Sequence, residues 1–118
     1  MYGLDKNENI NFLVGKELLQ VCVGAFQVIL ILDNDITITL ECEYEYEFNS
    51  QKINCSSDIP EQACSLLKSL GSKITNISNL GNGDIELGFS GGSVLKIYDS
   101  NKNSESYQII SPQKDIIV

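Results

Sequence analysis

The sequence contains no histidine, no arginine and no tryptophan, and these absences exclude several kinds of site. Without histidine, no histidine-based acid–base or nucleophilic centre can form. Residues 88–92 match the pattern G-x-S-x-G, but that motif needs a histidine base, so we expect a turn there and no enzyme activity. Without arginine, the chain cannot form the bidentate hydrogen bonds by which a guanidinium group binds phosphate. Because the formal charge of −8 also repels phosphates, we expect no nucleic acid as a partner.

Long apolar runs and closely paired cysteines are missing as well. The longest apolar stretch, residues 21–32, is far shorter than the ~20 residues of a membrane helix, so we expect no membrane partner. The first residues carry Asp5 and Glu8 and lack a secretory signal, which predicts a cytoplasmic protein. No C-x-x-C pair is present, so we expect no metal, no cofactor and four free thiols: Cys22, Cys42, Cys55 and Cys64.

Alternation of apolar and polar residues is the dominant pattern in the chain. It is unbroken over residues 36–48, which predicts one long strand with isoleucine, leucine and tyrosine on one face and threonine and glutamate on the other. Six further strands are expected, at residues 18–23, 26–33, 73–78, 84–89, 93–98 and 106–110, with a short one at 116–118. The stretch 49–57 is interpreted as a loop.

One helix is expected between these strands, at residues 58–70. Asp58 and Glu61 fit a capping box, and Ala63, Leu66, Leu67 and Leu70 form an apolar stripe at α-helical spacing. The segments before and after the helix have similar patterns, either as two meander-like halves or by convergent hairpin patterning. We therefore predict a single α+β domain over residues 1–118, mostly antiparallel β with one central helix.

A two-residue turn at Asn34-Asp35 would fix the register of the hairpin around it. Leu32 would then lie opposite Thr37, and Val28 opposite Glu41. In that register the stripe from Phe26 to Leu32 is either covered by the second half of the chain or exposed beside an acidic border. If it is exposed, its apolar side chains are candidate anchors for a partner: Phe26, Val28 and Leu30.

The row of alternating glutamates is the strongest candidate for a binding surface. Its members Glu41, Glu43, Glu45 and Glu47 would span ~20 Å on one side of a strand. Aligned like charges cost stability, and a basic partner would turn the repulsion into attraction, with Asp33 and Asp35 adding to it. The alternative interpretation is a solvated strand face, or an edge charged against aggregation.

Several segments resemble small bacterial proteins found beside polymorphic toxins. They are Tyr2-Gly3-Leu4, residues 12–18 (FLVGKEL), residues 20–24 (QVCVG), residues 38–43 (ITLECE), Leu70-Gly71 and the tail 107–118. The chain is similar there to immunity proteins, including those of contact-dependent growth inhibition systems. The resemblance implies a cytosolic protein that binds one cognate toxin, often a nuclease, and occludes its active site.

The acidic composition agrees with this resemblance, because a nuclease that grips phosphates is basic. We therefore predict an immunity protein that neutralises a basic toxin. The alternative is a non-catalytic structural or assembly module that self-associates through its β edges, so a homo-oligomer is possible.

Overall fold

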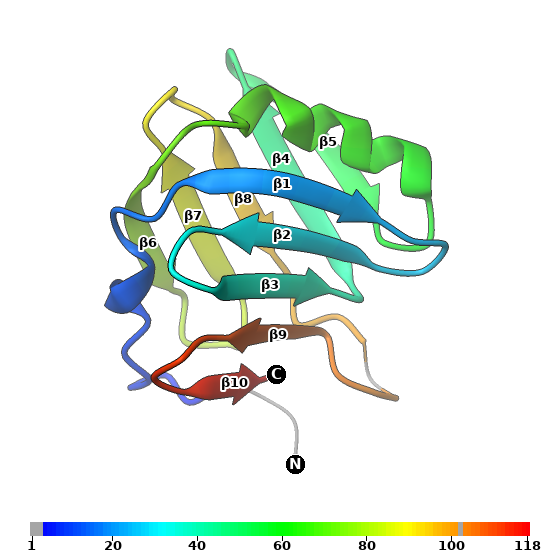
Figure 1. The fold of residues 1–118 in the computed structure, drawn as a ribbon. Helices are drawn as coiled ribbons and strands as arrows, with labels where there is room; N and C mark the ends of the chain where they lie inside the picture. Colours follow the sequence, from blue (N-terminus) through cyan, green and yellow to red (C-terminus); the bar gives the residue numbers. More distant parts are fainter. Residues whose placement is uncertain (1–3, 102) are drawn as a thin grey trace.

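The strands of the protein form two five-stranded antiparallel sheets that face each other, as seen in a computed structural model that describes residues 4–101 and 103–118 (Figure 1). The first sheet has the order β1 (Leu18–Val23), β2 (Val28–Leu32), β3 (Ile36–Leu40), β9 (Tyr107–Ile110) and β10 (Asp115–Ile117). The second has the order β5 (Gln51–Ser56), β4 (Glu43–Phe48), β8 (Val94–Ile97), β7 (Ile85–Phe89) and β6 (Ile74–Asn79). The expectation of a mostly antiparallel β protein with little helix is confirmed.

Each sheet combines a three-stranded meander with a two-stranded hairpin. The meanders are β1-β2-β3 and β6-β7-β8, and each begins with a strand that carries a register shift near its start. The hairpins are exchanged: β4-β5 follows the first meander in the chain but joins the second sheet, while β9-β10 follows the second meander and joins the first. The predicted halves are therefore not separate layers.

The two meanders meet where β1 and β6 begin. Glu17 and Lys73 form an isolated bridge, and Gly15 and Gly71 stand at equivalent places with φ values of 90° and 82°. The backbone hydrogen bonds of the two glycines are equivalent: Gly15 N–H donates to Ile74 O at 2.7 Å, and Gly71 N–H donates to Leu18 O at 2.9 Å. This junction closes one side of the space between the sheets.

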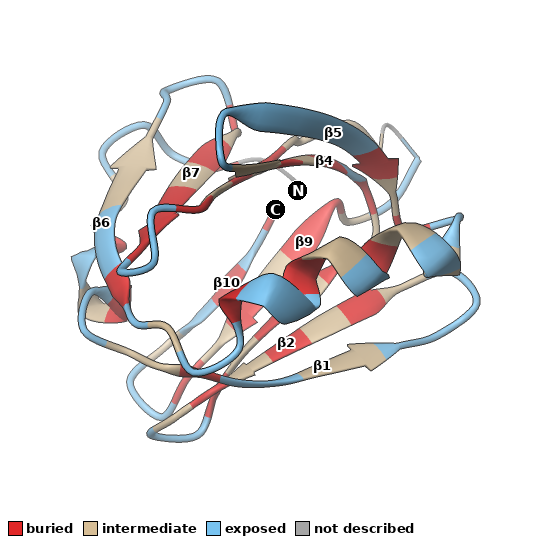
Figure 2. Ribbon diagram, turned by 90° about the horizontal axis from the view of Figure 1, so that it is seen from above, coloured by how far each residue is buried: buried red, intermediate tan, exposed pale blue. Residues whose placement is uncertain are grey.

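The core lies between the two sheets as one continuous cluster (Figure 2). The helix covers the side between β1 and β5, and η1 (Asn11–Leu13) contributes the buried Leu13. The largest fully buried side chains include Tyr44, Tyr46 and Tyr107. No helix among the described residues is long and apolar enough to cross a membrane. Tyr2 and Gly3 of the family resemblance lie outside the described residues.

The prediction of one long strand over residues 36–48 is wrong in one respect. The chain leaves the first sheet after Leu40, passes through Glu41 and Cys42, and enters the second sheet at Glu43. Alternation continues across this break because Leu40, Cys42 and Tyr44 all remain buried. The pattern reports the burial of side chains and does not distinguish one straight strand from two strands in facing sheets.

The hairpin register around Asn34 also differs from the prediction. Leu32 pairs with Ile36 and Val28 with Leu40, so three residues, 33–35, connect β2 to β3. This register places apolar side chains opposite each other on the core face. Val28 and Leu30 are therefore fully buried core residues, so the exposure that their role as anchors requires is not met, and for these two residues the stripe is covered.

The stretch 49–57 is mostly a strand where a loop was expected. Asn49 and Ser50 both have positive φ and connect β4 to β5 as a two-residue turn. Asparagine tolerates this conformation, which suits the twist of a tight hairpin. The strand β5 has little apolar character because it is an edge strand that pairs with β4 alone within the described chain.

The helix η2 (Pro60–Ser69) is of the 3₁₀ type where an α-helix was expected. With three residues per turn, side chains at i, i+3 and i+6 share a face. The core face accordingly carries Ala63, Leu66 and Ser69, whereas Leu67 and Leu70 of the predicted stripe are exposed. Asp58 makes no capping hydrogen bond, since the N-cap is Ile59 without a side-chain cap.

Candidate partner-binding surface

The two segments that cross between the sheets run side by side. The first crossing is Glu41–Cys42, and the second is formed by residues 98–101 and 103–106. Glu41 N–H donates to Ser106 O at 2.8 Å, Tyr98 N–H donates to Glu43 O at 3.1 Å, and Glu43 N–H donates to Ser100 Oγ at 3.0 Å. The start of the glutamate row is therefore fixed against a distant part of the chain.

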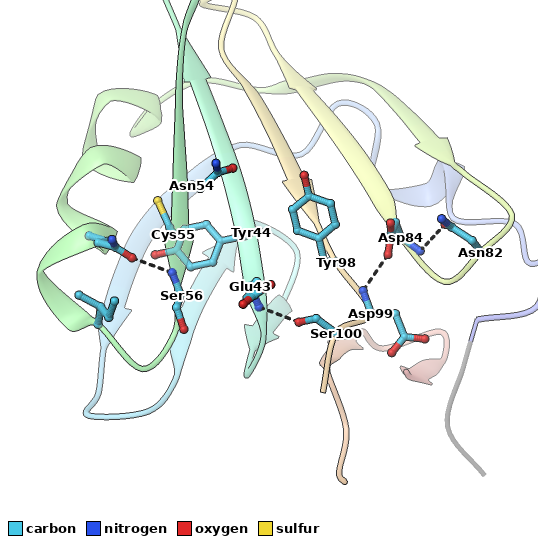
Figure 3. A pocket seen from close by; sticks show the side chains of 12 residues that line it. Glu43, Tyr44, Asn54, Cys55, Ser56, Asn82, Asp84, Tyr98, Asp99 and Ser100 are labelled. Carbon is cyan, nitrogen blue, oxygen red and sulfur yellow. Dashed lines mark hydrogen bonds between the residues drawn. The ribbon is translucent and has the colours of Figure 1, made fainter. Parts of the chain in front are cut away.

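Two adjoining pockets lie beside these crossings, with volumes of about 730 and 410 Å³, and share Glu43, Ser56 and Ser100. Figure 3 shows the larger of the two. We name them together the crossover hollow. None of its described lining residues is a lysine, whereas five of them are carboxylates: Glu43, Asp84 and Asp99 in the larger pocket, and Glu41, Glu43 and Asp58 in the smaller. As far as its described residues go, the hollow is thus a concave surface with charges of one sign.

Hydrogen bonds hold two of these carboxylates in place. Asp84 Oδ1 accepts from Asp99 N–H at 2.8 Å, and Asp99 Oδ1 accepts from Ser106 Oγ at 2.8 Å. Gly83 has a φ of 97°, and a Cβ there would lie 2.5 Å from Asp99 Oδ2. The Asp99 carboxylate can occupy this position only because residue 83 is glycine.

The buried phenol and thiols beside the hollow are neutral. Burial raises the pKa of the Cys42 thiol from its ordinary 9.0 to about 12, and it also raises the pKa of Tyr44 and of Cys55. The Tyr44 hydroxyl is fully buried and has no hydrogen-bond partner among the described residues. Negative charge at neutral pH therefore comes from the carboxylates alone.

The other two glutamates of the row lie beside positively charged side chains. Glu45 and Glu47 project from the outer face of β4, opposite to the buried Tyr44 and Tyr46. In the register, Glu45 is the cross-strand neighbour of Lys96, and Glu47 of Lys52. Within residues 4–101 and 103–118 the ion pair is Lys114 with Glu8, at 2.6 Å, so neither glutamate is bound to its lysine. The neighbouring lysines nevertheless weaken the negative potential there.

The aspartates proposed to assist the row lie on a different surface. Asp33 and Asp35 belong to the turn between β2 and β3 in the first sheet. Asp33 Oδ1 accepts from Glu17 N–H at 3.0 Å, which ties this turn to the start of β1. The structure does not bring these aspartates together with the glutamates of β4.

Phe26 is the one predicted apolar anchor that reaches solvent. It lies in the turn 24–27 between β1 and β2 and is 71% exposed, whereas Val28 and Leu30 are both 0% exposed. Phe26 does not line the crossover hollow. If it contacts a partner, it does so from outside the acidic surface.

Three carboxylates of the hollow escaped the sequence-based prediction: Asp58, Asp84 and Asp99. A signal for two of them was present, because Asp84 directly precedes β7 and Asp99 follows shortly after β8. Because β7 and β8 are neighbouring antiparallel strands, the start of one and the end of the other lie at the same end of the sheet. Asp58 had no such signal, since the strand before it was not expected.

No family model, no curated protein and no solved structure matches the chain. Across the described residues, no three cysteine, aspartate or glutamate side chains converge into a group that could hold a metal ion. The carboxylates of the hollow are instead spread along its wall. Such spacing suits several separate cationic groups on one macromolecule better than a single ion.

Proposed function

We propose that the chain is a bacterial immunity protein that binds and neutralises a cognate basic toxin of the nuclease type in the cytoplasm. The crossover hollow carries this proposal, because it gathers five carboxylates and no described lysine in one concave surface. A nuclease that binds phosphates presents lysine and arginine around its active site. Occupation of that site by an acidic surface would block the substrate without any chemistry on the inhibitor.

The geometry of the hollow favours fast capture of such a partner. Clefts lined by one sign of charge focus the electrostatic field and raise association rates. Carboxylates held by hydrogen bonds, such as Asp84 and Asp99, need little reordering when a cation arrives. The sequence resemblance to immunity proteins supports the same function independently of this geometry.

The test is the association rate with a basic toxin whose reading frame adjoins this gene, and the absence of such a reading frame would count against the proposal. Neutralising two hollow carboxylates with Glu41→Gln/Glu43→Gln should slow association about tenfold at low salt, because steering depends on charge. The matched control is Glu45→Gln/Glu47→Gln, which removes the same amount of charge from the other half of the glutamate row. Since Lys96 and Lys52 already offset these glutamates, we expect no more than about a twofold change.

Three outcomes would contradict the proposal. One is equal slowing by both double variants, which would mean that net charge acts without a defined site. Another is an unchanged rate for Glu41→Gln/Glu43→Gln. The last is failure of the wild-type protein to bind or protect against the neighbouring toxin, which would remove the inhibitor function itself.

One observation favours the alternative, an assembly module that self-associates through β edges. The six-residue strand β5 is an edge of the second sheet, and residues 51–54 are exposed. An edge of this length can pair with a second chain. A proline in place of the exposed Asn54 would interrupt such pairing, whereas binding of a toxin at the hollow should retain the salt dependence described above.

A further inference from the structure

The outer face of the first sheet is almost free of charge. Because Val28, Leu30 and Leu32 point into the core, Ile29 and Ile31 point outward from β2. The register extends this surface over all five strands, and we name it the isoleucine face: Gln20, Cys22, Ile29, Ile31, Thr37, Thr39, Gln108, Ile110, Asp115 and Ile117. Figure 1 looks onto it, and no described segment crosses in front of the strands.

The outer face of the second sheet has the opposite character. Glu45, Lys96 and Glu86 are consecutive neighbours across β4, β8 and β7, and Glu47 lies beside Lys52. Among its ten residues the isoleucine face has one charged side chain, Asp115, and four isoleucines. The Glu105 carboxylate lies at the border of the face, where it accepts a hydrogen bond from Gln108 Nε2 at 3.0 Å. In a chain with a formal charge of −8, this asymmetry between two solvent-facing sheets calls for a reason.

We infer that the isoleucine face binds a second copy of this chain, sheet against sheet, in a two-fold dimer. Two copies with a charge of −8 repel each other, and the repulsion is smallest where the contacting surfaces carry the least charge. An isologous contact uses the same patch on both copies, so it must be complementary to itself. An uncharged, β-branched surface meets that requirement, whereas the acidic hollow does not.

The strand arrangement suits such a contact. The face is centred on β3, with threonines, and isoleucine-bearing strands flank it on both sides, β2 and β9. If the two-fold axis runs along the strands, β2 lies over β9 of the other copy. If it runs across them, β2 lies over β2. Isoleucines therefore meet isoleucines in both cases, at the ~10 Å separation of packed sheets.

The area of the face sets the strength of the dimer. Five strands at ~4.8 Å spacing and about five residues in length give roughly 400 Å² per copy. A standard stable interface buries about 800 Å² per partner, so the association should be weak and dependent on concentration. In this arrangement the charged outer face of the second sheet stays on the outside of both copies.

Sedimentation equilibrium at increasing protein concentration tests the inference. The average mass should rise from the 13.0 kDa of one chain toward twice that value between about 10 µM and 1 mM. Added salt should shift the rise to lower concentration, because it screens the repulsion between the copies. Binding of a basic toxin at the hollow should weaken with salt, so the two proposals can fail separately.

Ile31→Lys should abolish the rise in mass, because it places a charge from each copy inside the uncharged contact. The matched control is Val94→Lys, which also replaces a β-branched residue by lysine but on the outer face of the second sheet, and it should leave the curve unchanged. Thr37→Lys, on the central strand, gives the same test if Ile31→Lys does not fold. A wild-type mass that stays at 13.0 kDa at 1 mM, or equal effects of the two lysine variants, would overturn the inference.

Discussion

Two buried tyrosines differ in one hydrogen bond and provide a direct comparison at the scale of single residues. Both Tyr44 and Tyr107 are 0% exposed. The Tyr107 hydroxyl donates to Gly83 O at 2.7 Å, whereas the Tyr44 hydroxyl has no hydrogen-bond partner in the part of the chain that the structure describes. Loss of a satisfied hydrogen bond costs about 1 kcal/mol, while an unsatisfied buried polar group costs about 1–3 kcal/mol in the native state.

We therefore expect opposite results from the same substitution at these two positions. Tyr107→Phe should lower the free energy of unfolding by about 1 kcal/mol, and Tyr44→Phe should leave it unchanged or raise it. Urea unfolding followed by circular dichroism measures both values. Equal destabilisation by the two variants would show that the Tyr44 hydroxyl has a partner after all.

The helix η2 gives a prediction at the scale of the element. Leu66 and Leu67 are adjacent, but the 3₁₀ geometry buries Leu66 to 2% exposure and leaves Leu67 49% exposed. Leu66→Ala should cost about 2–5 kcal/mol, as is usual for a buried leucine, and Leu67→Ala should cost much less, about 0.5 kcal/mol. Chemical unfolding of the two variants checks this difference. Similarly large losses of stability in both variants would show that Leu66 and Leu67 are both packed, as in the α-helical stripe that the sequence predicts.

The same element shows why only part of the fold is predictable from the sequence. Strand positions follow from alternation, because burial of one sheet face forces a period of two, and most expected strands are present. The helix type does not follow, since Ala63, Leu66, Leu67 and Leu70 fit an α-helical stripe while the fold selects Ala63, Leu66 and Ser69. That choice is made by the tertiary packing, which includes the bond of Ser69 Oγ with Tyr46 at 2.7 Å.

Across the whole molecule, the candidate site is less predictable than the core. Glu41 and Glu43 could be found from their place in the glutamate row. Their partners in the hollow, Asp84 and Asp99, are brought beside them by the exchange of hairpins between the sheets. Charge counts along a strand do not include neighbours from other strands, so the lysines that offset Glu45 and Glu47 also remain invisible in the sequence.

Stability of the whole molecule should fall steeply in alkaline solution. Burial raises the pKa of Cys42 from 9.0 to about 12, and burial is also the main reason for the raised pKa of Cys55, Tyr44 and Tyr107. Between these two pH values the unfolded chain has released the Cys42 proton while the folded chain retains it. The unfolded state therefore binds fewer protons, and the free energy of unfolding decreases as pH rises.

For Cys42 alone the loss should approach about 1.4 kcal/mol per pH unit between pH 9 and 12. Urea unfolding at a series of pH values from 7 to 11 gives this slope. In Cys42→Ala the thiol is removed, so the slope above pH 9 should be shallower, whatever the stability of that variant at neutral pH. Self-repulsion of the carboxylates is the same in both proteins, and so are the buried Cys55, Tyr44 and Tyr107. A slope that Cys42→Ala leaves unchanged would therefore show that the alkaline loss comes from these other groups and not from the Cys42 thiol.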